Sequence, residues 1–144
     1  MELLFSDEII ALIKELGMQW FIRLHPRQIN NLDKIKMLLE EQGVLSLVTI
    51  EEATELPLPQ LLSNATLHVT HYSGTAIEAS EMQTFTVLLH SIGAQSFEGL
   101  ISAGRATYLN PKDSKFSIKF KEVLVNTTKN ELTETRYSTR KELF

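Results

Sequence analysis

Hydrophobic residues along this chain follow two alternating patterns. Segments with apolar positions three and four residues apart, typical of one face of a helix, alternate with short apolar runs typical of buried strands. Helices are expected in five segments: 6–16, 31–42, 57–62, 74–82 and 96–103. Strands are expected in five segments: 20–24, 44–50, 66–72, 85–89 and 106–109. This alternation predicts an α/β fold, a three-layer Rossmann-like domain with a mostly parallel sheet of about five strands and helices on both faces.

The last part of the chain changes character. The spacing of Phe116, Phe120 and Leu124 predicts one further helix. The residues that follow turn rich in Thr, Lys and Glu, so that segment has little apolar surface to bury. We therefore assign residues 1–126 to the Rossmann-like domain and residues 127–144 to a loosely held polar C-terminal tail.

In two segments an apolar run typical of a buried strand ends abruptly in polar residues. One is Phe-Ile-Arg-Leu-His-Pro-Arg at 21–27, and the other is His-Val-Thr-His-Tyr-Ser-Gly-Thr-Ala-Ile-Glu-Ala at 68–79. In open α/β sheets ligands bind at the carboxyl ends of the strands, where a helix N-terminus offers unpaired N–H groups to a phosphate. Both segments therefore predict anion or nucleotide binding. Three histidines end predicted strands and are expected to converge on this edge: His25, His71 and His90.

The first segment combines a histidine, a proline and an arginine. Pro26 fixes the backbone and holds His25 outside the strand, while Arg27 adds a permanent charge suited to phosphate. An imidazole that donates an N–H can bind a diphosphate or stabilise a nucleotide leaving group. The alternative is that Pro26 only ends the strand and Arg27 is a solvated side chain. Arg23 interrupts the apolar run and needs a partner or an edge position.

The second segment has the composition of a strand-to-helix turn that holds an anion. The hydroxyls of Ser73 and Thr75 and several backbone N–H groups would converge beside Tyr72, and Gly74 would let a ligand approach the backbone closely. Glu78 lies one turn into the helix, where its carboxylate can accept hydrogen bonds from ribose hydroxyls. The alternatives are a plain helix cap by Ser73 or Thr75 and a first-turn acid favoured by the helix dipole.

Other chemistry fits these residues less well. A nucleophile elbow around Ser73 needs glycine two residues before and after the serine, but His71 and Thr75 stand there. A metal site lacks a histidine pair at helical spacing and a supporting carboxylate cluster, so no metal is predicted. His68 and His71 are three residues apart in a strand and face opposite sides, which removes them as a pair.

Composition narrows the classes of function. The net charge of −4 argues against a broad nucleic-acid surface, because such surfaces cluster Lys and Arg against phosphates. The absence of cysteine from the sequence excludes disulfides and thiolate metal sites. There is neither an apolar run long enough to span a membrane nor a secretory signal pattern at the N-terminus, so we expect a cytoplasmic protein.

Taken together, the two motifs resemble the C-terminal half of GT-B fold glycosyltransferases. The closest similarity is to bacterial polysaccharide-forming enzymes, including capsule transferases and the polyglycerol-phosphate transferases of teichoic acid synthesis. Those proteins carry a strand ending in Arg-x-His-Pro, matched here by residues 23–26. Further along they have a strand ending in a Tyr-Ser-Ser or Tyr-Ser-Gly turn before a helix, matched by residues 70–75. The resemblance covers about residues 6–110.

This resemblance implies a donor-nucleotide domain of a transferase in polysaccharide biosynthesis, which binds a nucleotide-sugar or similar activated donor and needs no other cofactor. His25 and Arg27 would contact the donor phosphate, residues 73–75 would hold phosphate at the helix start, and Glu78 would reach the ribose. His71 stands where the teichoic acid type commonly has aspartate.

In such enzymes a separate N-terminal domain binds the acceptor and usually supplies the catalytic base. The catalytic residues, and the activity of this chain alone, therefore stay open. A doubly wound domain normally opens on a strand, but this chain opens on a predicted helix. We accordingly expect the back part of a larger two-domain protein or a shortened relative of one. Two alternatives remain, a non-catalytic Rossmann-like interaction module and a sugar-nucleotide epimerase-like domain.

Overall fold

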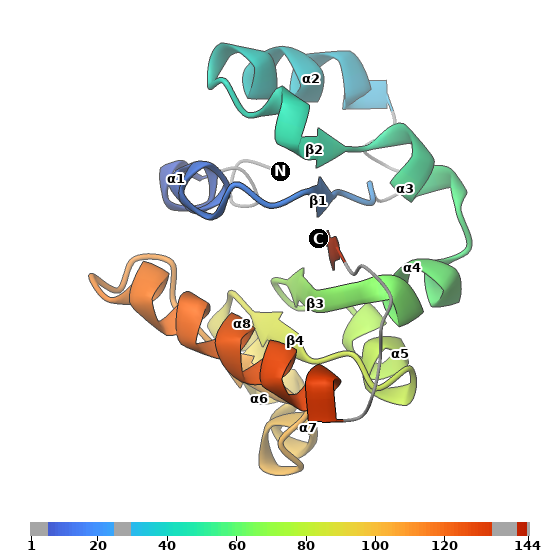
Figure 1. Ribbon diagram of the computed structural model, residues 1–144, viewed down its shortest axis with the longest axis vertical. Coiled ribbons are helices and arrows are strands. Elements are labelled where there is room, and N and C mark those ends of the chain that lie inside the picture. The colour runs from blue at the N-terminus through green and yellow to red at the C-terminus, as the bar shows by residue number, and fades with distance from the viewer. Residues whose placement is uncertain (1–5, 25–29, 134–140, 144) are drawn as a thin grey trace.

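The structure, a computed structural model, describes residues 6–24, 30–133 and 141–143 (Figure 1). Helices alternate with parallel strands along the chain, which confirms the predicted α/β class. The helices are α1 (Asp7–Leu16), α2 (Leu32–Glu41), α3 (Glu51–Glu55), α4 (Leu58–Asn64), α5 (Thr75–Glu81), α6 (Ser91–Ser96), α7 (Glu98–Ser102) and α8 (Phe116–Thr133), with a short 3-10 helix η2 (Leu45–Leu47). The strands are β1 (Trp20–Phe21), β2 (Val48–Thr49), β3 (Ala65–Thr70), β4 (Thr86–Leu88), β5 (Ala106–Tyr108) and β6 (Lys141–Leu143).

Helix α1 shows how the apolar spacing produces an element. Its buried residues include Ile9 and Ile13, which recur at helical spacing on one face. Gly17 ends the helix in the left-handed conformation, with φ +61°, and its N–H donates to the carbonyl of Ile13. That conformation favours glycine, so the sequence signal for the end of α1 is confirmed.

All strand pairings in the sheet are parallel. β1 pairs with β2, while β4 pairs with both β3 and β5. β6 lies between β1 and β3 and pairs with both of them. The resulting strand order is β2-β1-β6-β3-β4-β5.

This order differs in detail from the expected sheet of about five consecutive strands. The five predicted strands form, but they fall into a group of two and a group of three that meet only through β6. Hydrophobic runs identify segments that become strands, but the pairing of strands depends on contacts between distant parts of the chain. The joining strand comes from the polar end of the sequence, which carries no strand pattern.

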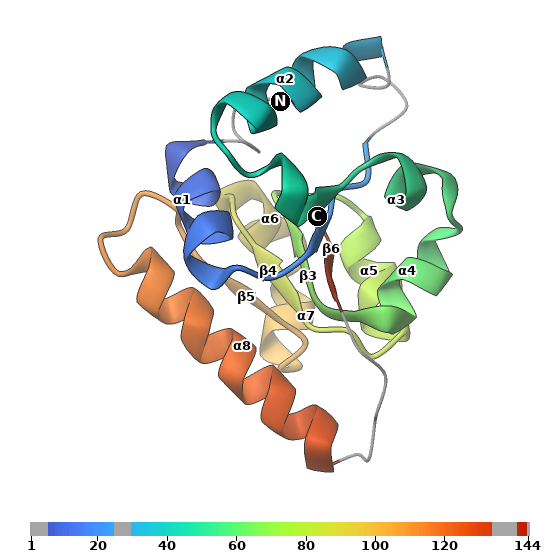
Figure 2. The same ribbon diagram turned by 45° about the horizontal axis from the view of Figure 1, so that its top comes forward.

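Helices cover both faces of the strands. Trp20 of β1 packs in a core cluster with residues of α1, α2 and α8, whereas the next residue, Phe21, packs with residues of α3, α4 and α5. Similarly, Val87 of β4 belongs to the first cluster and Leu88 packs against Ala76 of α5. Successive side chains of a strand point to opposite faces, so these clusters lie on opposite sides. Figure 2 shows α1 and α8 on one side and α4 and α5 on the other.

The polar end of the chain contributes more regular structure than its composition predicts. Helix α8 continues to Thr133, past the expected boundary at 126, and residues 141–143 form β6. The first half of α8 is fixed by its aromatic residues, since Phe120 is fully buried and its ring lies 6.0 Å from that of Trp20. A helix anchored in this way can extend through a polar segment without burying it.

Candidate functional site

The turns after β3 and β4 meet at the carboxyl edge of the sheet. The β3–α5 turn consists of residues 71–74, and the β4–α6 turn consists of residues 89–90. The ring of Tyr72 in the first turn meets the ring of His90 in the second edge to face, with centroids 5.5 Å apart and planes at 79°. The parallel topology therefore brings these two predicted strand ends together, as the sequence indicated.

Hydrogen bonds within the β3–α5 turn shape its backbone. The Ser73 N–H donates to the Thr70 hydroxyl at 3.4 Å, and the Thr75 N–H donates to the Ser73 hydroxyl oxygen at 3.2 Å. Although the N-cap position itself is Gly74 and has no side-chain cap hydrogen bond, the Ser73 hydroxyl thus accepts the N–H of the first residue of α5. Its own O–H proton makes no hydrogen bond to another described residue, and the side chain is exposed. The turn therefore leaves the Ser73 O–H available to an external acceptor.

Gly74 sits in an open position at the start of α5. Its backbone has φ −59° and ψ −13°, which any amino acid adopts, and a Cβ placed on it would meet no atom within 4 Å. Its N–H makes no hydrogen bond to another described residue. Neither the local conformation nor the packing of the described chain therefore requires glycine here.

The hydroxyl of Thr75 contacts a buried histidine, His68, in the core. The Thr75 hydroxyl lies 3.2 Å from Nε2 of His68, and Nδ1 of the same ring lies 3.0 Å from the hydroxyl of Thr86 on β4. Burial lowers the pKa of His68 to about 4, because the charged form loses its hydration there. The imidazole is therefore neutral at pH 7, donating from one nitrogen and accepting at the other.

This histidine was not a predicted site residue. Sequence reasoning removed His68 as a partner of His71, and the structure shows its actual partners on β4 and α5. Polar residues inside two neighbouring apolar strands, His68 and Thr86, were the available signal. His68 and Thr86 are paired neighbours on the parallel strands β3 and β4. Through its hydrogen bonds to Thr86 and Thr75, the buried His68 links β4 to the start of α5.

The packing of α6 fixes the second turn. His90 caps α6, since its Nδ1 accepts a hydrogen bond from the Ile92 N–H at 3.0 Å. A Cβ added to Gly93 would lie 2.2 Å from the carbonyl oxygen of His71. Only glycine allows this helix to approach the β3–α5 turn so closely, so Gly93 is a second position that sequence reasoning missed.

The first predicted segment is only partly described. His25 and Arg27 lie outside the described residues, and their predicted contacts with phosphate stay predictions. Arg23 finds partners, because its guanidinium donates to the carbonyl oxygens of Ala53 and Leu56 at the end of α3. The conflict of an arginine inside an apolar strand is thereby resolved by a structural role.

The remaining candidates occupy the same edge with different exposure. His71 is half-buried and Glu78 is exposed in the first turn of α5. The side chain of Glu78 makes no hydrogen bond or ion pair with another described residue, so its predicted contact with ribose stays a prediction. Within residues 6–24, 30–133 and 141–143, no three His, Asp or Glu side chains gather closely enough to hold a metal ion.

The reversal of strand order also lies at this edge. From β1 the chain moves outward to β2, and from β3 it moves outward in the other direction to β4 and β5. With β6 between them, β1 and β3 stand about 10 Å apart, twice the usual strand spacing. Ligands of open α/β sheets bind at such a reversal, on the side of the carboxyl ends.

No helix in the described part of the chain is both long and apolar enough to cross a membrane. Comparison of the sequence and the structure with protein families, curated proteins and solved structures finds no match.

Proposed function

We propose that this chain binds the phosphate groups of a nucleotide-activated donor at the β3–α5 turn. In this proposal it is the donor-binding domain of a glycosyltransferase-like protein that transfers a sugar or related group in polysaccharide biosynthesis. The observation that carries the proposal is the open glycine at position 74, next to the exposed hydroxyl of Ser73, at the carboxyl edge of a parallel sheet.

The absence of a structural requirement for glycine at position 74 supports a ligand at this position. A glycine usually serves a positive φ angle or a close contact within the chain, and Gly74 has neither. An open glycine in a turn at the carboxyl edge of a parallel sheet can let an external group reach the backbone, as phosphates do in glycine-containing turns, whereas the equally open Gly99 lies inside α7. An alanine there would place its methyl group in the path of that ligand.

The groups around Gly74 suit a phosphate. The free N–H of Gly74 and the O–H of Ser73 are donors, and both residues are exposed. Donors held in a fixed turn bind an anion without a large ordering cost. Compensating positive charge would come from Arg27, and from His25 when protonated, if the first segment reaches the same ligand.

The finer architecture belongs to the same proposal. We infer a three-layer Rossmann-like domain in which β6 completes one parallel sheet of six strands. The opposite-face clusters around Trp20 and Phe21 support the three layers. Such a sheet would place both motifs of the GT-B resemblance on either side of one crevice.

Calorimetric titration of the purified chain with UDP, CDP and GDP tests the proposal. At least one of these nucleotides should bind, and Gly74→Ala should weaken it about tenfold, equivalent to about 1.4 kcal/mol. Gly99→Ala is the matched control, because Gly99 is also exposed with no atom within 4 Å of an added Cβ, but lies in α7. Absence of binding at millimolar nucleotide, or equal weakening by both variants, would contradict the proposal.

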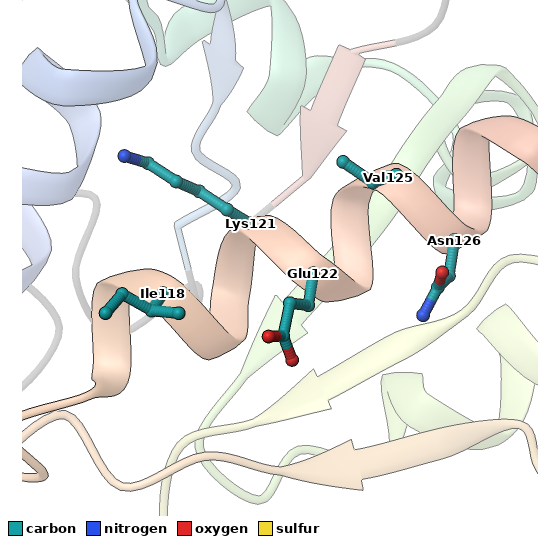
Figure 3. A pocket seen from close by; sticks show the side chains of 5 residues that line it. All are labelled: Ile118, Lys121, Glu122, Val125 and Asn126. Carbon is teal, nitrogen blue, oxygen red and sulfur yellow. The ribbon is translucent and has the colours of Figure 1, made fainter.

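One observation favours a second candidate, a non-catalytic interaction module. A pocket of about 470 Å³ lies along α8, and its described lining residues all belong to that helix (Figure 3): Ile118, Lys121, Glu122, Val125 and Asn126. The apolar side chains of Ile118 and Val125 are exposed. An interaction module would form a stable oligomer that nucleotides do not change, which size-exclusion chromatography with light scattering detects.

A further inference from the structure

We propose that the position between β1 and β3 is an acceptor site for a β-strand of another polypeptide, and that β6 fills it as a replaceable substitute (Figure 1). The partner that fits this site is an apolar, extended segment that runs parallel to both neighbouring strands. The inference is independent of the proposed phosphate site, because it concerns the middle of the sheet and not the turns at its carboxyl edge.

Backbone edges on both sides define the acceptor site. β1 pairs with β6 through Trp20 and Phe21, and β3 pairs with β6 through Ala65 and His68. A strand placed here therefore bonds to two neighbours at once, whereas a strand added along β2 or β5 bonds to only one. Main-chain hydrogen bonds of this kind provide the affinity in complexes that form by strand addition.

The core clusters on both faces of the sheet continue across the acceptor site. Trp20 of β1 and Val69 of β3 belong to one cluster, to which α1 and α8 also contribute. On the other face Phe21 of β1 and Ala65 of β3 share a cluster with residues of α3, α4 and α5. A strand that is buried on both faces of a parallel sheet normally consists almost entirely of apolar residues. The surroundings of the site therefore favour an apolar strand.

Strand β6 matches these surroundings poorly. Its sequence is Lys-Glu-Leu, and lysine and glutamate are both depleted in strands. Its register with β3 is also irregular, because the pairs are Ala65 with Lys141 and His68 with Leu143, so that β3 advances by three residues while β6 advances by two. The pairings of β4 with β3 and with β5 are regular by contrast. Composition and register both indicate a strand that an apolar one can displace.

The place of β6 in the chain allows it to leave the sheet. It ends at Leu143, one residue before the last residue of the sequence, and no described helix or strand follows it. Its release breaks the pairings with β1 and β3 but leaves the pairing of β1 with β2, and those of β4 with β3 and β5, intact. Local opening of this kind requires less free energy than unfolding of the whole domain. A second strand can then take the vacated position.

Binding of a synthetic strand to the full chain tests this inference. The probe is a fluorescein-labelled peptide of sequence Lys-Val-Ile-Val-Ile-Lys. Its control peptide has proline in place of the first isoleucine, because proline cannot donate to a strand ladder. Fluorescence anisotropy should show saturable binding of the probe and no binding of the control. Hydrogen exchange followed by mass spectrometry should become slower in β1 and β3, and faster in β6, when the probe is bound.

Two variants of β6 should change the affinity for the probe in opposite directions. Lys141→Val combined with Glu142→Val improves the strand that competes with the probe and should weaken binding about tenfold. Glu142→Pro removes an N–H from β6 and should strengthen binding about tenfold. The matched control is Lys34→Val combined with Glu40→Val, which removes the same two residue types from exposed positions of α2 and should change the affinity less than about twofold.

The site of protection and the response to β6 decide the inference. Slower exchange in β2 or β5, and not in β1 and β3, would mean that the probe adds to an outer edge and that the inference is wrong. It is equally wrong if neither the wild-type chain nor any folded variant binds the probe, or if both β6 variants leave the affinity unchanged. If circular dichroism shows that Glu142→Pro does not fold, the double valine variant decides alone: weaker binding supports the acceptor site, and unchanged binding overturns it.

Discussion

The turns that follow β3 and β4 lie side by side, and each has a glycine close to the start of the helix that comes after it: Gly74 is the last residue of the first turn, and Gly93 lies in the first turn of α6. At Gly93 the chain fills the available space itself, because a Cβ would collide with the His71 carbonyl at 2.2 Å. At Gly74 the same test finds no atom within 4 Å. One glycine is explained by packing inside the protein, and the other is not.

At this edge of the sheet, the difference distinguishes residues that serve the packing of the chain from residues that are open to a ligand. The β4–α6 turn and the buried His68 form a support that is satisfied by contacts within the chain. The β3–α5 turn rests on that support but presents an unfilled surface with two donors and an exposed ring. The comparison predicts that substitutions in the support change stability, whereas substitutions on the open side change ligand binding.

The largest effect is expected for Gly93→Ala. The added methyl group would have to displace the His71 carbonyl or the first turn of α6, and such overpacking costs about 3 kcal/mol. Urea denaturation measures the free energy of unfolding of this variant and of the wild-type chain. A change below about 0.5 kcal/mol, the usual range for an exposed site, would show that the two turns do not differ.

Acid should destabilise the chain through His68. The pKa of this residue is about 4 in the folded chain and about 6.5 when exposed on unfolding, so between these values the unfolded state binds the extra proton. The contribution of neutral, buried His68 to the free energy of unfolding is therefore complete above pH 6.5 and declines as the pH falls towards 4. The loss attributable to His68 between pH 7 and pH 5 should be about 2 kcal/mol.

The variant His68→Gln separates this effect from other titrating groups. Glutamine can still bond to a threonine on each side but carries no titrating proton, so the decline between pH 7 and pH 5 should become shallower. Denaturation at several pH values measures the slope for both proteins. Parallel curves would mean that His68 titrates normally and is not the buried support of Thr75.

A smaller stability effect is expected for Gly74→Ala. The helical φ and ψ at this position accept alanine, so the free energy of unfolding should change by only about 0.5 kcal/mol or less. A saturating nucleotide should raise the melting temperature of the wild-type chain and raise that of the variant much less. A large loss of stability without ligand would show that Gly74 serves the fold.

The smallest effect on nucleotide binding is expected for Gly99→Ala, because Gly99 lies in α7 and outside both turns. Alanine inside the short helix α7 should stabilise it by about 0.5 kcal/mol through its higher helix propensity. Nucleotide binding should stay unchanged in calorimetry. A loss of binding here would show that the site extends to α7 or that any alanine substitution perturbs it.

Elements with a complete apolar period were the ones that the sequence predicted well. Helices α1, α2, α4 and α5 form close to the expected segments, because their apolar faces and end signals are local properties. Helices α3 and α6 span five and six residues and were missed, whereas the equally short α7 lies inside the predicted segment 96–103, whose end is marked by Gly104. The polar strand β6 was missed because its place depends on the unpaired edges of β1 and β3.

Candidate site residues followed the same rule. The position of residues 71–75 at a strand end could be predicted, since it requires only one strand and the helix after it. The partners of Thr75 could not, because His68 and Thr86 meet it through strand pairing. Likewise, Gly74 and Gly93 look alike in the sequence, and only the approach of α6 to the His71 carbonyl distinguishes them.

The most direct test of the open turn is to follow backbone amide signals by NMR during titration with UDP, CDP and GDP. We predict that the signals of Ser73 and Gly74 move with saturable dependence on at least one nucleotide, while the signal of Gly99 stays in place. If no nucleotide moves the signals of Ser73 and Gly74 at millimolar concentration, or if the shifts appear along α8 instead, the β3–α5 turn is not the phosphate site.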